Sequence, residues 1–278
     1  MYDAEISRTN PGCFLFLIDQ SGSMSDPFSS NKNVPKSRGV ADAINRLLAN
    51  LVLKCTKDDG IRNYFDVGVI GYGNPEVVPA FQGALSGHEL VKMEALGNNP
   101  LRVEERTQQF PDGAGGAIEK PVKFPVWFDP IANSSTPMCK AIAYTKGIVE
   151  RWVTEHQNSY PPIVINITDG DSTDGNPVPH AIDLTKLGTN NGNVLFFNIH
   201  ISSQSSVPIL YPDTEQALPD QYGKALFEMS SLLPEPMMQA AQNEGYTATA
   251  QSRGFGFNAD LVSLIKFVDI GTRVGNLR

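Results

Sequence analysis

The chain has 278 residues, of which 41% are hydrophobic and 19% charged, the balance of a folded protein rather than a disordered one. Its net charge is −8 and no block of Lys or Arg occurs, so nucleic acid is not an expected partner. No apolar run approaches the roughly 20 residues that cross a bilayer, and we expect no membrane-spanning segment.

Three cysteines, Cys13, Cys55 and Cys139, are an odd number without the spacing of a metal site. Such usage predicts free thiols in a reducing compartment. The first residues, "MYDAEISRTNPG", lack the apolar core of a secretory signal. We therefore expect a cytoplasmic protein.

The first two thirds of the chain alternate between apolar runs and helical patterns. The runs "CFLFLI", "YFDVGVIGY", "PIVINIT" and "NVLFFNIHI" predict buried strands at 13–18, 64–72, 162–168 and 193–201. Apolar spacing predicts helices over 39–55, 136–156 and 181–188, the last ended by Gly188 as its C-cap. Continuous rather than alternating apolar runs are typical of a parallel sheet covered by helices on both faces.

The last third continues this pattern less regularly. Residues 224–233 predict a helix, and "RGFGFN" at 253–258 predicts a tight turn. A final helix follows at 258–268, with Asn258 or Asp260 as its N-cap.

Two segments interrupt the alternation. Residues 74–131 are rich in Gly and Pro with short β-like pieces, which predicts a β-rich surface insertion of hairpins. Residues 202–222 predict an irregular loop. The whole pattern predicts one domain over 1–278, an α/β fold with a doubly wound, mostly parallel sheet flanked by helices.

Five oxygen-bearing side chains follow the ends of predicted strands or begin a helix. Asp19, Ser21 and Ser23 leave the first strand at alternate positions, Thr136 precedes a helix, and Asp169 follows the strand at 162–168. Open α/β sheets bind ligands at the carboxyl ends of their strands. Carboxylates and hydroxyls suit a hard cation, so the sequence predicts a Mg²⁺ or Mn²⁺ site.

These three segments, "DQSGSM", "STPM" and "ITDG", resemble the von Willebrand factor A (VWA) family and its metal-ion-dependent adhesion site. The resemblance covers roughly residues 12–75 and 131–202. It implies that Ser21 and Ser23 bind the metal directly and that Asp19 and Asp169 do so directly or through water. Thr136 would join or leave with conformation, and a Glu or Asp of a protein partner would complete the coordination.

The surroundings of the motif are similar to the intracellular bacterial branch of the family, the tellurite-resistance-type and conflict-system proteins. That branch implies an adaptor in a multiprotein system with a MoxR-like AAA+ ATPase, a kinase or a phosphatase. The resemblance implies protein binding rather than catalysis.

Other interpretations of the same residues stay open. A metal-assisted hydrolase could use the same acids, with His180 the histidine expected nearest to them, and a metal-independent scaffold would use them only to shape the edge of the sheet. An EF-hand in "DGDSTDG" is rejected because its twelfth position is His180 rather than Glu. We interpret Asp171 and Asp174 as parts of a solvated turn.

Overall fold

The computed structural model describes residues 2–28, 32–73, 76–111, 117–201, 207–219 and 221–271. Within these residues an eight-stranded sheet forms the centre of the molecule. Its strands, in chain order, are β1 (Gly12–Asp19), β4 (Phe65–Tyr72), β5 (Val77–Pro79), β6 (Val91–Lys92), β9 (Ile163–Thr168), β12 (Leu195–Ile201), β13 (Ile209–Leu210) and β14 (Phe255–Ala259). The short hairpins β2–β3 (Thr56–Lys57, Gly60–Ile61) and β10–β11 (Gly188–Thr189, Gly192–Asn193) and the long hairpin β7–β8 (Arg102–Pro111, Ala117–Val126) lie outside it.

The middle five strands are parallel and run in the order β14-β12-β9-β1-β4. Three short strands are antiparallel: β13 pairs with β14 at one edge, while β5 and β6 pair with β4 at the other. The chain therefore leaves β1 toward β4 and then crosses back to β9 on the other side of β1. This reversal makes the sheet doubly wound.

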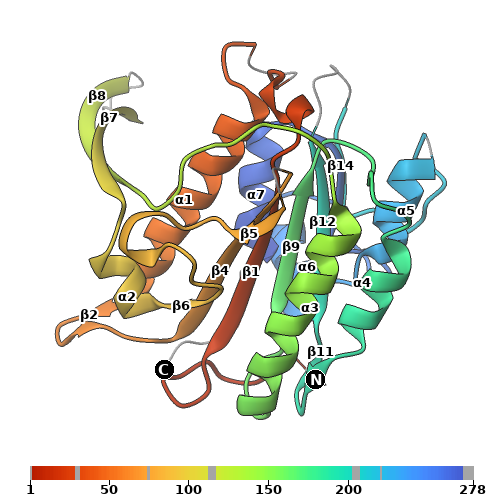
Figure 1. Cartoon of the computed structure of the whole chain (residues 1–278), viewed down its shortest axis with the longest axis horizontal. Coiled ribbons are helices and arrows are strands. Elements are labelled where there is room, and N and C mark those ends of the chain that lie inside the picture. Colours follow the sequence, from red (N-terminus) through yellow and green to blue (C-terminus); the bar gives the residue numbers. More distant parts are fainter. Residues whose placement is uncertain are drawn as a thin grey trace.

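Helices cover both faces of this sheet (Figure 1). They are α1 (Lys36–Cys55), α2 (Met93–Asn98), α3 (Met138–Glu155), α4 (Val178–Thr185), α5 (Gln221–Met229), α6 (Glu235–Asn243) and α7 (Leu261–Gly271), with short 3-10 turns η1 (Gly22–Ser25) and η2 (Gly83–Leu85). Buried side chains of α3, α4 and α5 share one core, and those of α1, α2, α6 and α7 share the other.

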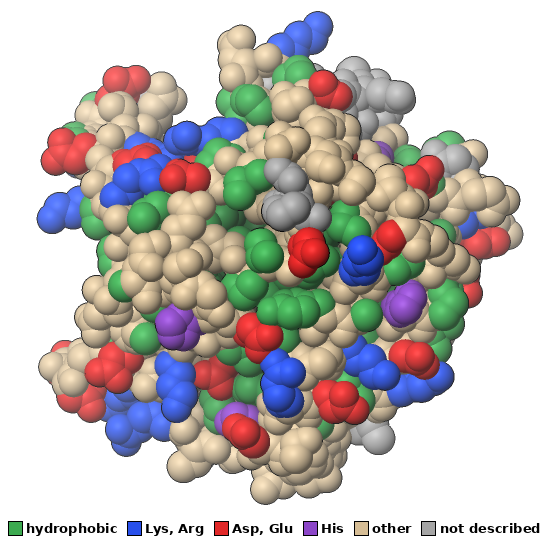
Figure 2. All heavy atoms as spheres, in the orientation of Figure 1, with side chains coloured by type: hydrophobic (Ala, Val, Ile, Leu, Met, Phe, Trp, Pro, Cys, Tyr) green, Lys and Arg blue, Asp and Glu red, His purple; other side chains and the backbone are tan. Residues whose placement is uncertain are grey.

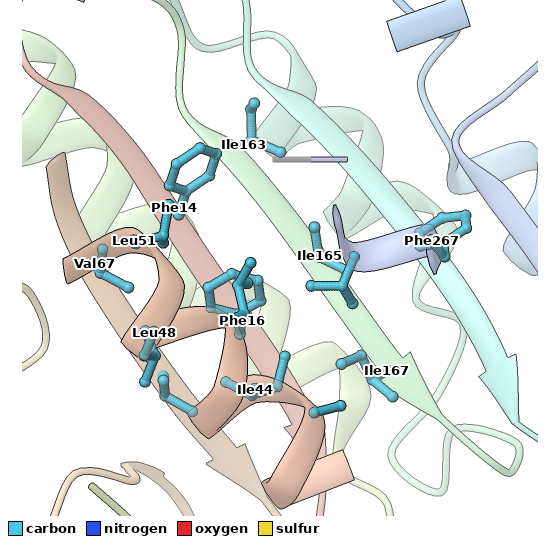
Figure 3. Close-up of a cluster of buried hydrophobic side chains, with 14 of the residues drawn as sticks. Phe14, Phe16, Ile44, Leu48, Leu51, Val67, Ile163, Ile165, Ile167 and Phe267 are labelled. Carbon is cyan, nitrogen blue, oxygen red and sulfur yellow. The ribbon is translucent and has the colours of Figure 1, made fainter. Parts of the chain in front are cut away.

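The alternation of side chains along β1 builds these two cores. Phe14 and Phe16 face the core of α1 and α7, whereas Leu15 and Leu17 face the core of α3 and α4. Figure 3 shows the first of these cores, where Ile44, Leu48 and Leu51 of α1 lie over the phenylalanines of β1. All eight residues of β1 are buried, as a continuous apolar run predicts. The sheet thus holds the end of β1 rigidly.

The predicted fold class is confirmed: the structure has a mostly parallel sheet, doubly wound, with helices on both faces. The segment 74–131 does include the β7–β8 hairpin, which projects from the body (Figure 1). The same segment also supplies β5 and β6 to the central sheet and buries Trp127 and Phe128 in the core. Its prediction as a surface insertion is therefore wrong for these parts.

Two local predictions about the later part of the chain are wrong, one helix there was not predicted, and one of two predicted N-caps is confirmed. Residues 253–258 do not form a tight turn, because Phe255–Ala259 is strand β14. Helix α4 ends at Thr185, so Gly188 is no C-cap and instead begins strand β10. Helix α6 was not expected. The N-cap of the last helix is Asp260, whose carboxylate accepts the Ser263 N–H at 2.8 Å.

The surface carries both signs of charge. Figure 2 shows Lys, Arg, Asp and Glu side chains interspersed over the face that α3 covers. None of the described helices combines the length and apolar character that crossing a membrane requires.

Candidate metal centre

The carboxyl ends of β1 and β9 form the edge of the sheet where the candidate residues lie. Strand β1 ends at Asp19 and β9 ends at Thr168, one residue before Asp169. The two strands are hydrogen-bonded neighbours, and the winding of the sheet reverses at β1. Such a switch point is where open α/β sheets place their ligands.

Asp19 is buried and held by two hydrogen bonds. The backbone N–H of Ser21 donates to its Oδ1 at 2.8 Å, and the Thr168 hydroxyl donates to its Oδ2 at 2.8 Å. Burial raises the pKa of Asp19 from 3.8 to about 6, because these hydrogen bonds offset only part of the desolvation and the charge of Asp169 adds to it. A buried carboxylate of this kind is stabilised by a nearby cation.

A chain of hydroxyl contacts joins Asp19 to Asp169. The Oγ atoms of Ser21 and Ser23 lie 3.1 Å apart, and the Ser23 hydroxyl donates to Asp169 Oδ1 at 2.8 Å. Four of the five residues selected from the sequence are thus connected, from two segments that lie 146 residues apart.

The second oxygen of Asp169 has a different environment. Asp169 Oδ2 is buried and, within the described residues, accepts no hydrogen bond of normal geometry. It lies 2.5 Å from Lys36 Nζ, and the two side chains are 0% and 5% exposed, respectively. A buried carboxylate oxygen paired with an ammonium marks a position that attracts cations, which a metal site also requires.

Thr136 lies on the same edge but outside this chain of contacts. It is buried, its N–H donates to Thr173 Oγ1 at 3.0 Å, and its carbonyl accepts the Thr173 N–H at 2.9 Å. Among the described contacts, its hydroxyl is bonded to none of Asp19, Ser23 and Asp169. Thr136 is therefore adjacent to the loop that carries Asp169 without joining the other four residues.

Backbone contacts fix the loops around the site. The N–H of Gly22 donates to Ser134 O at 3.1 Å, and the N–H of Asn133 donates to Gln20 O at 2.6 Å. Gly73, directly after β4, lets the chain pass close to Gln20: a Cβ at Gly73 would lie 2.5 Å from the Gln20 carbonyl carbon. Residues 20–22, directly after β1, therefore lie between the segment at 133–134 and the end of β4.

Asp174 is an exposed residue of the turn after β9, as the sequence suggested, and it also caps a helix. Its carboxylate accepts the N–H groups of Cys139 at 3.0 Å and Lys140 at 2.9 Å, which begin helix α3. An acid from the loop after β9 thus caps a helix that precedes β9 in the chain. Asp171 is exposed too, as expected, and among the described contacts no hydrogen bond links it to a helix.

The oxygen atoms gathered here fit a hard divalent cation. Two carboxylates and up to three hydroxyls match the preference of Mg²⁺ and Mn²⁺ for oxygen. Within the described parts of the chain, no three His, Cys, Asp or Glu side chains cluster as a metal site. Zinc, which prefers Cys and His, is disfavoured.

A recess lies beside this edge. It has a volume of about 310 Å³ and is lined by residues from the loop after β9 and from α5, among them Asp171, Ser172, Tyr222, Leu226 and Met229. Its mixture of apolar and polar walls can accept a side chain next to the acids.

Sequence reasoning missed two residues that shape this site, Lys36 and Asp174. A lysine at the start of a helix carries no pattern that links it to an acid far along the chain. Asp174 offered a weak signal, since an acid in a loop can cap a helix brought close by the fold. Neither contact could be located without the pairing of β1 and β9.

No protein-family model matches the chain, and no curated protein sequence matches it. Solved structures to which it is similar include the manganese-loaded TRAP protein of Plasmodium vivax, with 12% identity, coverage of 94% of this chain and 72% of that one, and a TM-score of 0.42. They also include the SpRpn10 VWA domain, with 14% identity, coverage of 70% and 77%, and a TM-score of 0.37. A third is the vWF domain of the type V pili tip protein Mfa5 from Porphyromonas gingivalis, with 14% identity, coverage of 97% and 99%, and a TM-score of 0.38. Identities of 12–14% and TM-scores of 0.37–0.42 carry no information on the metal, partner or activity of this chain.

Proposed function

We propose that the chain is a protein-binding module of the von Willebrand factor A type that uses a Mg²⁺ or Mn²⁺ ion to bind an acidic side chain of a partner. The observation that supports this is the connected set of Asp19, Ser21, Ser23 and Asp169 at the switch point of the sheet. The motif order in the sequence and the buried oxygen of Asp169 agree with it.

Each residue has a role in this proposal. Asp19 and Asp169 supply the negative charge that attracts the ion, and Ser21 and Ser23 supply neutral oxygens. When bound, the ion offers an open coordination position to an external carboxylate. Thr136 lies near enough to the Asp169 loop to join after a local rearrangement, which is the role that the family resemblance implies.

The partner we propose is a protein that presents a Glu or Asp, with neighbouring side chains that enter the recess beside Asp171. In keeping with the motif surroundings, we place the module in a cytoplasmic multiprotein system with an AAA+ ATPase of the MoxR type or a signalling enzyme such as a kinase or phosphatase. The proposal requires binding and no reaction.

The experiment is a calorimetric titration of EDTA-stripped protein with Mg²⁺ and Mn²⁺. We expect one saturable site whose affinity falls by about tenfold or more in Asp19→Asn, since one of two carboxylate charges is lost. The matched control is Asp171→Asn, which removes an exposed charge at the same edge and should change affinity by no more than about twofold.

Absence of binding by the wild-type protein, both alone and with millimolar acetate or a Glu-containing peptide, would contradict the proposal. The metal-independent scaffold would then be the better interpretation. Melting curves of each variant in EDTA serve as the control for folding.

A further inference from the structure

Lys36 is the first residue of α1 and lies against the candidate metal centre. Its side chain is 5% exposed, and its ammonium is 2.5 Å from Asp169 Oδ2. The backbone of Lys36 is fixed as well, because its N–H donates to Asp26 O at 2.8 Å. The ammonium is therefore held in place beside the buried carboxylate.

This position is unfavourable for a lysine in two respects. The N-terminus of a helix carries partial positive charge, so a cation there opposes the helix dipole, and the first turn of α1 holds no acid to offset it. Burying an ammonium also costs free energy unless it is paired. Asp169 is the close partner that offsets both costs, which indicates that the pair is a built part of the site.

We propose that Lys36 is a tethered cation that competes with the divalent ion for Asp169 and thereby makes metal binding depend on an acidic ligand. This inference rests on the proposed function. Any ion that uses Asp169 must lie close to the ammonium, and the two positive charges repel each other in a buried site, where screening by water is weak.

Charge counting shows why an acidic ligand relieves this repulsion. Two ionised carboxylates and one ammonium give the site a net charge of −1, which a divalent ion would change to +1. A carboxylate from a partner returns the total to zero. Lys36 thus weakens binding of the ion alone and favours binding of the ion together with an anion. Binding of the ion and binding of a partner's carboxylate would therefore strengthen each other.

The test compares wild-type protein with Lys36→Met, which keeps the length of the side chain and removes its charge. The matched control is Lys140→Met, since Lys140 is exposed in the first turn of α3, which starts at the same edge. EDTA-stripped proteins are titrated with Mg²⁺ and Mn²⁺, with and without millimolar acetate. We expect Lys36→Met to bind the metal about tenfold tighter without acetate, and Lys140→Met to differ from wild type by no more than about twofold.

Acetate provides the second readout. It should strengthen metal binding by wild-type protein more than by Lys36→Met, because only the wild-type site needs the extra negative charge. Lys36→Gln, which can still donate a hydrogen bond to Asp169, replaces Lys36→Met if that variant fails to fold in EDTA, and the same results are expected.

The outcomes separate this inference from the function on which it rests. If wild-type protein binds the metal and the uncharged Lys36 variants bind it equally or more weakly, the proposed competition is wrong. The proposed metal site would still stand. If no protein binds the metal, with or without acetate, both the competition by Lys36 and the proposed metal-dependent function are overturned. Binding by the uncharged variants alone would support the competition in its strongest form.

Discussion

Two carboxylates of one site have distinct surroundings. Both oxygens of Asp19 accept hydrogen bonds, yet burial dominates and raises the pKa of Asp19 to about 6. Asp169 has one oxygen on Ser23 and the other beside the Lys36 ammonium. In the absence of metal, Asp19 is therefore the acid whose ionisation opposes folding.

The cost of ionising buried Asp19 should appear in the free energy of unfolding of the metal-free protein. A pKa that is higher in the folded than in the unfolded state contributes stability at acid pH and loses it as the pH rises through the folded value. From a pKa near 3.8 unfolded to about 6 folded, we expect wild type to lose about 2.4 kcal/mol relative to Asp19→Asn between pH 4 and pH 8. Urea unfolding in EDTA at several pH values measures the difference.

The prediction is tested by how the difference in free energy of unfolding between the two proteins changes with pH. Its value at a single pH is no test, because Asn also changes the hydrogen bonds of Ser21 and Thr168. A difference between the two proteins that stays constant from pH 4 to pH 8 would contradict it. Saturating Mg²⁺ should remove most of the slope if the ion binds beside Asp19.

At this scale the sequence allowed the five oxygen-bearing residues to be selected, since strand ends and helix starts can be located from apolar patterns. Lys36 could not be selected, because its role depends on a single long-range contact with Asp169. The role of Thr136 stays a prediction: its described bonds, with Thr173 and Met138, are made by its backbone and not by its hydroxyl.

Among the elements, α3 depends on a residue outside itself. Its first N–H groups have no partners within the helix, and the Asp174 carboxylate accepts two of them. Burial raises the pKa of Asp174, but the bonds from Lys140 and Cys139 outweigh it, so the pKa is lowered overall. The cap also fastens the loop after β9, which carries Asp169.

Asp174→Ala should reduce the free energy of unfolding by about 1–2 kcal/mol, the usual cost of losing a capping acid. The effect should be present at neutral pH and fade below pH 3.8, where the carboxyl is protonated in the unfolded state and, with further acid, in the folded state. Chemical unfolding at pH 7 and pH 3 measures it. Asp171→Ala, at an exposed position of the same loop, is the control, and an equal loss there would refute the cap.

Elements with strong apolar periodicity were predictable, and β14 was not. Gly254 just before this strand and Gly256 within it suggested a turn, yet a side chain at either position would clash with a neighbouring side chain. A Cβ at Gly254 would lie 2.1 Å from the ring of Phe197, and one at Gly256 would lie 2.8 Å from Leu210. Close approach of neighbouring strands, which local sequence does not encode, selected glycine here.

The β7–β8 hairpin is anchored to helix α1, away from the carboxyl ends of β1 and β9 where the candidate site lies. The Asn45 side chain of α1 bonds the backbone of Trp127 and Phe128 just after the hairpin, at 2.8 and 3.1 Å. Arg106 pairs with Asp42 of α1 at 3.0 Å. These anchors are made by β7 up to Arg106 and by the two residues that follow β8.

Replacing residues 108–120 by an Asn-Gly turn, which joins the paired residues Thr107 and Pro121, should therefore leave the core and the site intact. We expect the free energy of unfolding to change by less than about 1 kcal/mol and the Mg²⁺ affinity by less than about threefold. Urea unfolding and calorimetry measure both. A large loss of Mg²⁺ affinity would mean that the hairpin supports the edge of the sheet after all.

The pairing of β1 with β9 also determines when the site can form. The Thr168 hydroxyl and the Asp19 carboxylate that it contacts lie 149 residues apart, so each such contact closes a very long loop. Contacts of this separation form slowly, and at a synthesis rate of about 5–20 residues per second Thr168 is made roughly 7–30 s after Asp19. The early chain can pair β1 only with β4. The candidate metal centre can therefore form only after β9 has paired with β1.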